Sequence, residues 1–509
     1  GQVDLNISAV GLGVTHVDGS LALSDLKTRL APELQMLVLK HAASEIDFQK
    51  RDDGRLVQLK LTKFAFTDQA GQAEKPADIF IKHERAGQDG AEDDTLSFRA
   101  SRLDLARLRT LAAHLPLQDD VQKALRAAQP AGVLEKLKIK GRFVDGHLTD
   151  YAGQGVFSGL ALTADNGQRF IKGLSGSIEL TQDRGQLILD TGVSTLASPG
   201  VLPITEVPLA LMTGQINWKI GRDKLAVTLK NLQLKNADMQ TEVNGTWSGS
   251  LQTDASEQDK AGEIDMKLTF GYANTESAWK YIPTSASADI SKWMKASISG
   301  GTISDFRIEM QGRVWDMPYG SPVPGAASES SESKGAPGKF YLGFKTKQLN
   351  VKYAEGYPLL EKLNANFAMN QNQIQIVATD GQISGMKFSA IKAEMPDVMA
   401  YENHLLVSGQ ASGATRGVVS FLTNSPVAEH IHHFADGMSA EGDGRLDMAL
   451  DLNLAVPSDV KINGQYQFQN NQIGVVADTP PVQRVNGSLK FTQDTMDSKD
   501  LEGQWLGQP

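Results

Sequence analysis

The sequence predicts a mainly β protein with a few short amphipathic helices, whose one-sided strands must either close their apolar faces on themselves or leave them open to an apolar guest. Two observations predict this fold. Leu446, Met448, Leu450 and Leu452 alternate with small or polar residues, and successive side chains of a strand point to opposite faces. The 48 glycines suit a chain with many turns. Each predicted strand therefore has one apolar face and one polar face.

The same alternation recurs along most of the chain, for example in 216–220, 225–229 and 264–270. A module of a Gly-, Ser-, Gln- or Asn-rich strand start, an alternating strand, a polar turn and a second strand appears near 176, 214, 363 and 487. Its spacing is irregular, so we predict a loose array instead of a strict repeat. A strand and turn every 8–12 residues or so predicts roughly 35–45 strands.

Apolar residues at helical spacing interrupt this pattern in three regions. Segments 103–112 and 121–128 predict two short helices that end near Pro116 and Pro130. Asp289 is expected to cap a second helical region, and Thr415 a third. These helices would either cover part of an open sheet or pack beside it as satellites.

We expect eight segments along the chain, two of them mainly helical and one a flexible Ser/Pro/Gly loop. Segment 87–94 is a second expected flexible loop. The eight are a β segment (1–95), a helical hairpin insertion (96–141), β-groove modules (142–272), a helix-containing linker motif (273–320), the flexible loop (321–338), further β modules (339–414), short helices (415–437) and the C-terminal β modules of a truncated fragment (438–509).

Composition excludes several classes of function. The net charge of −10 argues against a nucleic-acid partner. The absence of cysteine excludes disulfides, thiolate metal sites and thiol nucleophiles. No stretch approaches the ~18–20 apolar residues of a membrane helix, and no signal peptide is visible. Because the chain starts with Gly1 in strand-like sequence and without Met, we expect an excised fragment, so the absence of an anchor here says nothing about the full-length protein.

The sequence offers no catalytic or metal-binding motif. His430, His432 and His433 cluster near two carboxylates, and on a helix His430 and His433 would share a face. Their spacing matches no metallohydrolase signature, so a surface helix end is the favoured interpretation. No nucleophile elbow, P-loop or dinucleotide fingerprint occurs, and the carboxylates are scattered. We therefore expect no enzyme, no cofactor and no metal.

A series of short elements in a fixed order resembles the AsmA-like envelope proteins of Gram-negative bacteria, in particular the YhdP group. The resemblance covers residues 95–430 well. The rest of the chain shares only the general pattern of alternating strands separated by polar turns. Tyr357-Pro358 stands where this family usually has Trp-Pro. The elements that carry it are 103–106, 115–117, 130–132, 214–218, 279–283, 293–296, 300–301, 310–313, 317–319, 338–340, 349–353, 357–358, 393–397 and 407–413.

This resemblance implies a β-rich periplasmic body that an N-terminal helix, missing here, anchors to the inner membrane. Such proteins are similar to bridge-like lipid transporters, so the resemblance implies a long curled antiparallel sheet that forms an open trough, an elongated β groove. The implied function is to conduct phospholipids between the inner and outer membranes along a hydrophobic β groove and to support the outer-membrane permeability barrier. The implied partners are phospholipid acyl chains, the inner membrane and outer-membrane or periplasmic proteins. The family offers no catalytic residues to carry over.

Apolar strand positions are the candidate contacts for the acyl chains, because a curled sheet with its apolar faces inward would enclose a groove. The candidates are Ile216, Trp218, Leu229, Leu268, Phe270, Ile376, Leu450 and Leu452. Closed β sandwiches or barrels would give the same alternation and make these residues ordinary core. A non-catalytic scaffold for outer-membrane proteins, which would offer an exposed edge strand, is the alternative function, and a surface adhesin is a third.

Overall fold

The computed structural model describes the chain except for residues 12, 33, 52, 54, 87–92, 116–118, 146, 164–168, 287, 320–337, 457, 477 and 509. The two expected flexible loops, 87–94 and 321–338, lie largely outside the described residues. The described strands form one large antiparallel sheet of 28 strands that does not close on itself, accompanied by a few short helices. The predicted mainly β fold with an open antiparallel sheet is therefore confirmed.

The expected number of strands was too high. The strands are longer than the sequence suggested, and β8 alone runs over 17 residues from His147 to Thr163. Turn residues such as glycine and asparagine lie inside strands at bulges as well as between strands, so counting them overestimates the number of strands.

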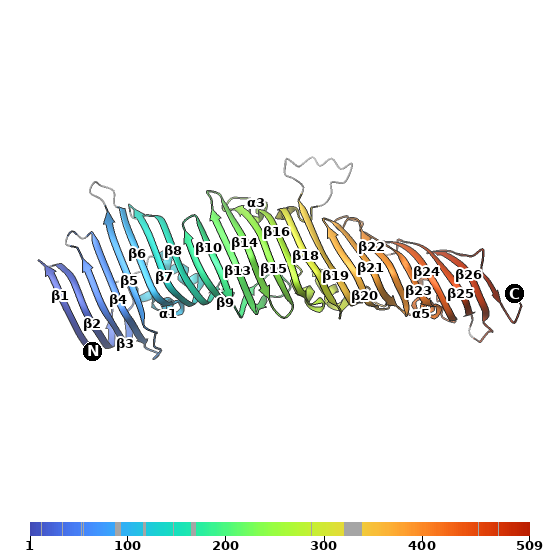
Figure 1. The fold of residues 1–509 in the computed structure, drawn as a ribbon, viewed down its shortest axis with the longest axis horizontal. Coiled ribbons are helices and arrows are strands. Elements are labelled where there is room, and N and C mark those ends of the chain that lie inside the picture. Colours follow the sequence, from blue (N-terminus) through green and yellow to red (C-terminus); the bar gives the residue numbers. More distant parts are fainter. Residues whose placement is uncertain are drawn as a thin grey trace. The chain divides into compact units, whose positions relative to one another are not determined.

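The chain divides into two compact units. The first comprises Gly1–Pro199, Thr205–Asn236 and Ser248–Ala255, and the second comprises Gly200–Ile204, Ala237–Trp247 and Ser256–Pro509. In the first unit, β1 to β10 pair in chain order, and β13 then pairs with β10 and β14. In the second unit, β16 pairs with β18, and β18 to β26 follow in chain order. Figure 1 shows this order within each unit.

The elements up to β14 are β1 (Gln2–Val10), β2 (Gly13–Thr28), β3 (Leu37–Lys50), β4 (Leu56–Asp68), β5 (Ala77–Ala86), β6 (Asp93–Asp104), α1 (Leu105–Leu111), η1 (Ala112–His114), α2 (Asp119–Ala128), β7 (Ala131–Val144), β8 (His147–Thr163), β9 (Arg169–Thr181), β10 (Arg184–Thr191), β11 (Ser194–Ala197), β12 (Glu206–Leu209), β13 (Leu211–Ile220) and β14 (Lys224–Lys235).

The elements from β15 onward are β15 (Met239–Ser250), α3 (Glu257–Ala261), β16 (Glu263–Ala273), η2 (Thr275–Tyr281), α4 (Ala288–Ser297), β17 (Ile298–Ser299), β18 (Thr302–Arg313), η3 (Val314–Asp316), β19 (Lys339–Val351), β20 (Leu360–Asn370), β21 (Gln373–Ile383), β22 (Met386–Met395), β23 (His404–Ala414), α5 (Thr415–Thr423), α6 (Val427–His430), β24 (Ser439–Asn453), β25 (Val460–Gly474), β26 (Val482–Thr492), β27 (Met496–Asp497) and β28 (Glu502–Gln504).

The two ends of the strands differ in what connects them. We call the end of the strands where the longer helices connect them the helix side. In the first unit, α1 and α2 join β6 to β7 at this end. In the second unit, η2 and α4 follow β16 there, and α5 and α6 join β23 to β24. The opposite end is the turn side, where short links such as those between β7 and β8 or between β20 and β21 predominate. In Figure 1, α1 and α5 lie at the lower ends of the strands of their own units.

The predicted helices are confirmed, but two predicted caps are wrong. Segments 103–112 and 121–128 correspond to α1 and α2. Asp289 lies inside the first turn of α4 instead of preceding it. Thr415 is the first residue of α5, and no side chain caps that helix at Ala414. Its hydroxyl is used for tertiary contacts instead, which the local sequence does not reveal.

A recurring bulge bends the strands. Lys63, Gln348, Lys362 and Asn470 have left-handed backbone conformations with φ between 50° and 57°, and each lies where the pairing register shifts. The backbone N–H of each of these residues donates a hydrogen bond to a side-chain oxygen of a residue on an adjacent strand. The pairs and their N···O distances are Lys63 with Asp78 (2.9 Å), Gln348 with Asn364 (2.9 Å), Lys362 with Asn350 (3.1 Å) and Asn470 with Asn486 (2.8 Å). Bulges increase the local bend and twist of a strand, so these contacts fix where each strand bends.

Burial is concentrated toward the helix side of each unit. In the first unit, Leu39, Ala42 and Phe66 form a buried cluster against which Leu111 of α1 packs. In the second unit, Ala365, Ala378 and Phe388 form a comparable cluster. Of the buried hydrophobic residues in the described part, only Tyr319 lies on the turn side; the others lie in helix-side connections, in the helix-side halves of strands or near strand centres.

A buried polar cluster fastens α5 to the sheet. Asn471 is fully buried, and the exposed fractions of Thr415 and Tyr466 are 3% and 4%. The Thr415 hydroxyl accepts hydrogen bonds from the Tyr466 hydroxyl at 2.8 Å and from the Asn471 amide at 2.6 Å. Burial raises the pKa of the Tyr466 phenol, although its bond to Thr415 opposes this. Asn471 also donates to the Glu441 carbonyl at 3.1 Å. Because these groups are out of water, the hydrogen bond between the Thr415 and Tyr466 hydroxyls is satisfied only while α5 stays in place.

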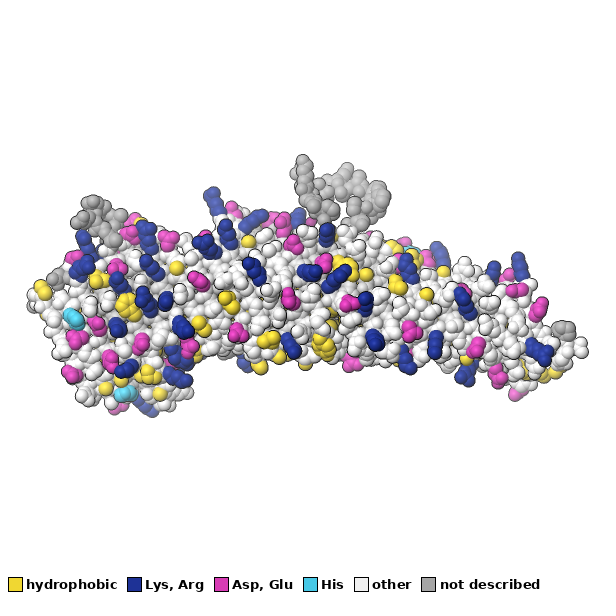
Figure 2. Space-filling view, viewed as in Figure 1, with side chains coloured by type: hydrophobic (Ala, Val, Ile, Leu, Met, Phe, Trp, Pro, Cys, Tyr) yellow, Lys and Arg dark blue, Asp and Glu magenta, His cyan; other side chains and the backbone are white. Residues whose placement is uncertain are grey.

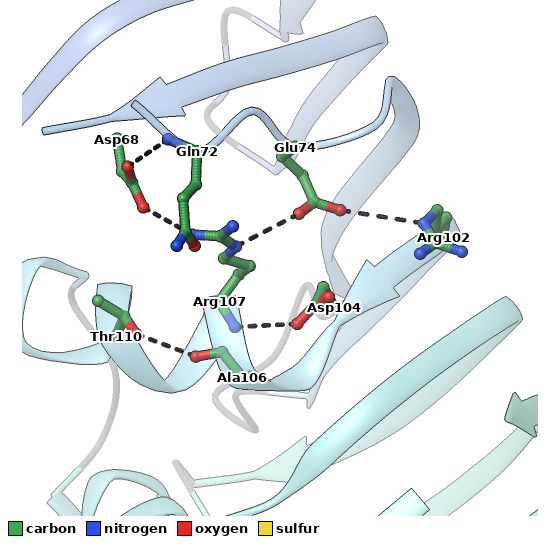
Figure 3. A network of polar contacts seen from close by, with 8 residues as sticks. All are labelled: Asp68, Gln72, Glu74, Arg102, Asp104, Ala106, Arg107 and Thr110. Carbon is green, nitrogen blue, oxygen red and sulfur yellow. Dashed lines mark hydrogen bonds and ion pairs between the residues drawn. The ribbon is translucent and has the colours of Figure 1, made fainter. Parts of the chain in front are cut away.

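In the first unit, a set of charged side chains holds α1 (Figure 3). Asp104 caps the helix by accepting the Arg107 N–H at 3.1 Å, and the Arg107 guanidinium binds Asp68 at 2.6 Å. Glu74 lies 3.9 Å from both Arg107 and Arg102. Burial, and then the nearby charge of Asp104, raise the pKa of Glu74, while the two arginines oppose the rise. The link between β4 and β5 is thereby tied to the first turn of α1.

Thr415→Val tests the polar cluster under α5. The isosteric change removes the acceptor that Tyr466 and Asn471 share, so two buried donors lose a partner and the free energy of unfolding should fall by about 1–3 kcal/mol. Urea unfolding measures it. Thr423→Val is the matched control, because the Thr423 hydroxyl bonds only to carbonyls of its own helix, and it should stay within about 0.5 kcal/mol. Equal effects of the two changes would contradict the anchoring role.

Candidate functional site: the apolar face of the sheet

In the first unit, one apolar row crosses the sheet without a polar interruption. Each member lies directly opposite the next on the neighbouring strand. Opposed residues share a face, with Cβ atoms about 4.5–5.5 Å apart. The row therefore makes a continuous apolar surface from β2 to β14. Its members are Val17, Phe48, Leu59, Ile81, Phe98, Ile139, Gly153, Leu180, Gly185, Trp218 and Val227.

Glycines in this row make room for large side chains. A Cβ on Gly185 would overlap the Trp218 indole, so the ring lies over the glycine backbone of the neighbouring strand. Ile216, two residues away on the same face, lies between Leu187 and Leu229. Three of the candidate residues, Ile216, Trp218 and Leu229, are therefore brought together.

In the second unit, four phenylalanines begin a comparable row. The rings of Phe270 and Phe306 stack with centroids 4.0 Å apart, Phe306 meets Phe344 edge-on at 5.7 Å, and Phe344 stacks on Phe367 at 4.8 Å. Phe367 lies opposite Ile376, and the row continues across four further strands. Its remaining members are Ile376, Ala393, Val407, Leu450 and Ile462.

A second row of the same unit lies one step nearer the turn side. It passes from Leu268 to Ile308, Leu342, Met369, Ile374 and Met395. After a gap in the pairing it resumes at Leu405, Leu452 and Val460. Its side chains are half-buried: their neighbours in the sheet cover their flanks, but they are not enclosed.

The opposite face of the same strands is polar. Lys267 pairs with Glu309 at 3.8 Å, and on β21 and β22 Gln375 donates to Glu394 at 2.9 Å. The Lys392 ammonium, 2.7 Å from Glu394, is the main reason why the pKa of that carboxyl is lowered. In Figure 2, charged side chains of both signs are spread over the face of each unit that is turned to the viewer. Strand alternation thus separates an apolar face from a charged face.

The described residues contain no group of three or more His, Asp or Glu side chains that could hold a metal ion. The favoured interpretation of the histidine cluster as a surface helix end is confirmed for His430, which is exposed, whereas His430 and His433 do not share a helical face. Helix α6 ends at His430, and His433 has a left-handed φ of 58°. His430 bonds to the Pro426 carbonyl at 2.9 Å and His433 to Asp436 at 2.9 Å. Each histidine therefore serves its own local turn.

Enclosed cavities do not account for the apolar rows. Hollows of about 360 and 520 Å³ occur on β1–β4 and on β16–β20; the lining of the first is mainly polar, and that of the second mixes polar residues with Met266, Met310 and Phe340. The apolar rows form an open surface instead, which suits an elongated apolar guest better than a compact polar ligand.

All eight candidate residues are half-buried on the apolar face of their strands. Their contact with lipid stays a prediction. The sequence reasoning missed Phe306 and Phe344, although each alternates with polar neighbours. Of the row in the first unit it singled out only Trp218, and it missed Phe48 and Phe98. The alternation in 57–61 and 79–82 was the available signal, but which residues line up across strands depends on register, which the bulges shift.

The family model described as YhdP protein matches residues 5–509. The chain belongs to the YhdP family. No curated protein and no solved structure matches the chain. YhdP proteins are cell-envelope proteins, and membership suggests a bridge-like role in lipid transport in the envelope and not a catalytic one. Among the described helices, none is long and apolar enough to cross a membrane.

Gly185→Ala tests the packing of Trp218. The new Cβ would overlap the indole, so the ring must move or the strands must separate, and the free energy of unfolding should fall by about 1–3 kcal/mol. Thermal or urea unfolding measures the change. Gly192→Ala is the control, because a Cβ there has no neighbour within 4 Å. If Gly185→Ala were as stable as the control, Trp218 would not lie over that glycine.

Proposed function

We propose that the apolar face conducts phospholipids between the inner and outer membranes, with the chain acting in the periplasm and anchored to the inner membrane. The observation that carries the proposal is the unbroken apolar row across neighbouring strands in each unit. Acyl chains need a continuous apolar surface, and each row supplies one within its unit. Family membership supports the same class of function.

The energetics suit a conduit. Burying a methylene stabilises an acyl chain by about 0.8 kcal/mol, and a bilayer gives a similar gain. The transfer of a tail between a membrane and the apolar face is therefore nearly neutral, so the lipid can enter and leave. Half-exposed side chains such as Leu268 and Leu450 retain apolar surface that a guest would cover. The polar headgroup would remain in water, so the transport path requires no convergent charged pocket.

Leu450→Asp tests the proposal in cells, with Ala449→Asp as its matched control. The two residues are neighbours on β24, where Leu450 lies on the apolar face and Ala449 is exposed on the opposite face. A carboxylate at Leu450 must be desolvated when a tail covers it, which costs more than ~1.4 kcal/mol, so phospholipid recovered with the protein should fall roughly tenfold or more. Ala449→Asp should leave recovery unchanged.

The readouts are radiolabelled phospholipid recovered with the protein and the barrier of the outer membrane to detergent. Leu450→Phe, which keeps the position apolar, should retain both activities and separates loss of binding from loss of folding. If Leu450→Asp folds, binds lipid and maintains the barrier as well as Ala449→Asp does, the conduit is wrong. A barrier defect without any change in bound lipid would favour the scaffold alternative, in which an edge strand receives an outer-membrane protein.

A further inference from the structure

The apolar face of each unit is unevenly covered. In the first unit, α1 lies over the helix-side ends of β3 and β4, where Leu39 and Phe66 have exposed fractions of 5% and 6%. In the second unit, α5 lies against β23 and β24, and the Gly417 backbone is close to Met386. Met386 and Phe388, at the helix-side end of β22, have exposed fractions of 3% and 4%. The protein's own side chains therefore already cover these parts of the helix-side half.

Polar contacts keep this cover in place. The α5 helix cannot lift without breaking the hydrogen bonds that Thr415 accepts from Tyr466 and Asn471, and a buried group left unpaired costs about 1–3 kcal/mol. The α1 helix is held through Arg107, which binds Asp68 of β4 at 2.6 Å. Both helices are thus fixed parts of the fold, and displacing them is an expensive way to admit a lipid.

The turn-side half has much less cover among the described residues: its one buried hydrophobic side chain is Tyr319, which lies over Gly312 and Gly338 near the turn-side ends of β18 and β19. In the first unit, Leu96, Ile139 and Leu148 lie on the apolar face with exposed fractions of 38%, 44% and 50%. In the second unit, the row from Leu268 to Met395 is half-buried, although its neighbours within the sheet already cover its flanks. Half of an 11-residue strand such as β21 spans roughly 18 Å, so the uncovered strip is broad.

We infer that acyl chains lie along the turn-side half of the apolar face in each unit, while the helix-side half is permanently filled by the protein's own helices and connections. This inference rests on the proposed function and refines it. It places the lipid path against Phe98 in the first unit and against Phe340 and Leu342 in the second. It removes the surfaces around Phe157 and Phe388 from that path.

Photocrosslinking tests the inference with matched aromatic positions. A photoreactive phenylalanine analogue would replace Phe98 or Phe340 on the turn side, Phe157 or Phe388 on the helix side, and Phe80 or Tyr341 on the polar face. Each set has one member per unit, and the exposed fractions of Phe157 and Phe388 are 3% and 4%. Radiolabelled phospholipid should attach several-fold more at Phe98 and Phe340 than at the four other positions.

The outcomes separate the two hypotheses. Equal or stronger lipid adducts at Phe157 and Phe388 would overturn the turn-side path but leave the proposed function standing. No lipid adduct at any position on the apolar face would overturn both. Protein adducts without lipid at Phe98 and Phe340 would mean that a partner protein covers this half, and would also overturn the inference.

A second measurement guards against misfolding of the helix-side variants. The chain has no cysteine, so single Phe→Cys variants at the four apolar-face positions can be labelled with a maleimide before and after lipid is removed. We expect the cysteines at 98 and 340 to react faster once lipid is removed, and those at 157 and 388 to react slowly in both states. Lipid-dependent labelling at 157 and 388 would contradict the inference.

Discussion

The structure depends on cross-strand register that keeps apolar residues opposite apolar residues. A slip of one residue would move a strand's apolar set to the polar face. Phe270 opposite Phe306, Leu268 opposite Ile308 and Leu450 opposite Val407 all depend on this register. Where it holds over many strands, separate half-buried side chains join into a surface, and the proposed conduit is a property of that surface.

The bulges reconcile this register with curvature. Long strands of a large sheet must twist or bend. An extra residue that is not accommodated in a bulge would move the apolar side chains beyond it to the polar face. At Lys63, Gln348, Lys362 and Asn470 the extra residue is held in a left-handed conformation, with its N–H bound by an Asp or Asn side chain of an adjacent strand. The apolar alternation then resumes beyond the bulge, so the strands bend without losing the continuous face.

The insertions give the sheet its asymmetry. Connections on the turn side are mostly short, while some of those on the helix side are long and place α1 in the first unit and α5 in the second against the sheet. Polar contacts anchor both helices, between Arg107 and Asp68 for α1 and between Thr415, Tyr466 and Asn471 for α5, and leaving a buried polar group unpaired costs about 1–3 kcal/mol. The turn-side half, which these helices do not cover, is the part of the apolar face that an apolar guest can contact.

The sequence by itself determined the class of fold, the faces of individual strands and the absence of thiol chemistry, because alternation with a period of two and composition are local properties. It also placed α1, α2, α4 and α5 to within a few residues. It did not determine the number of strands, the use of Thr415 or the partners of Phe306 and Phe344. Those depend on bulges and on contacts between residues far apart in the chain, such as Thr415 with Asn471. Only the tertiary structure decided which apolar positions line up and which of them the helices cover, since register and packing are set jointly by many strands.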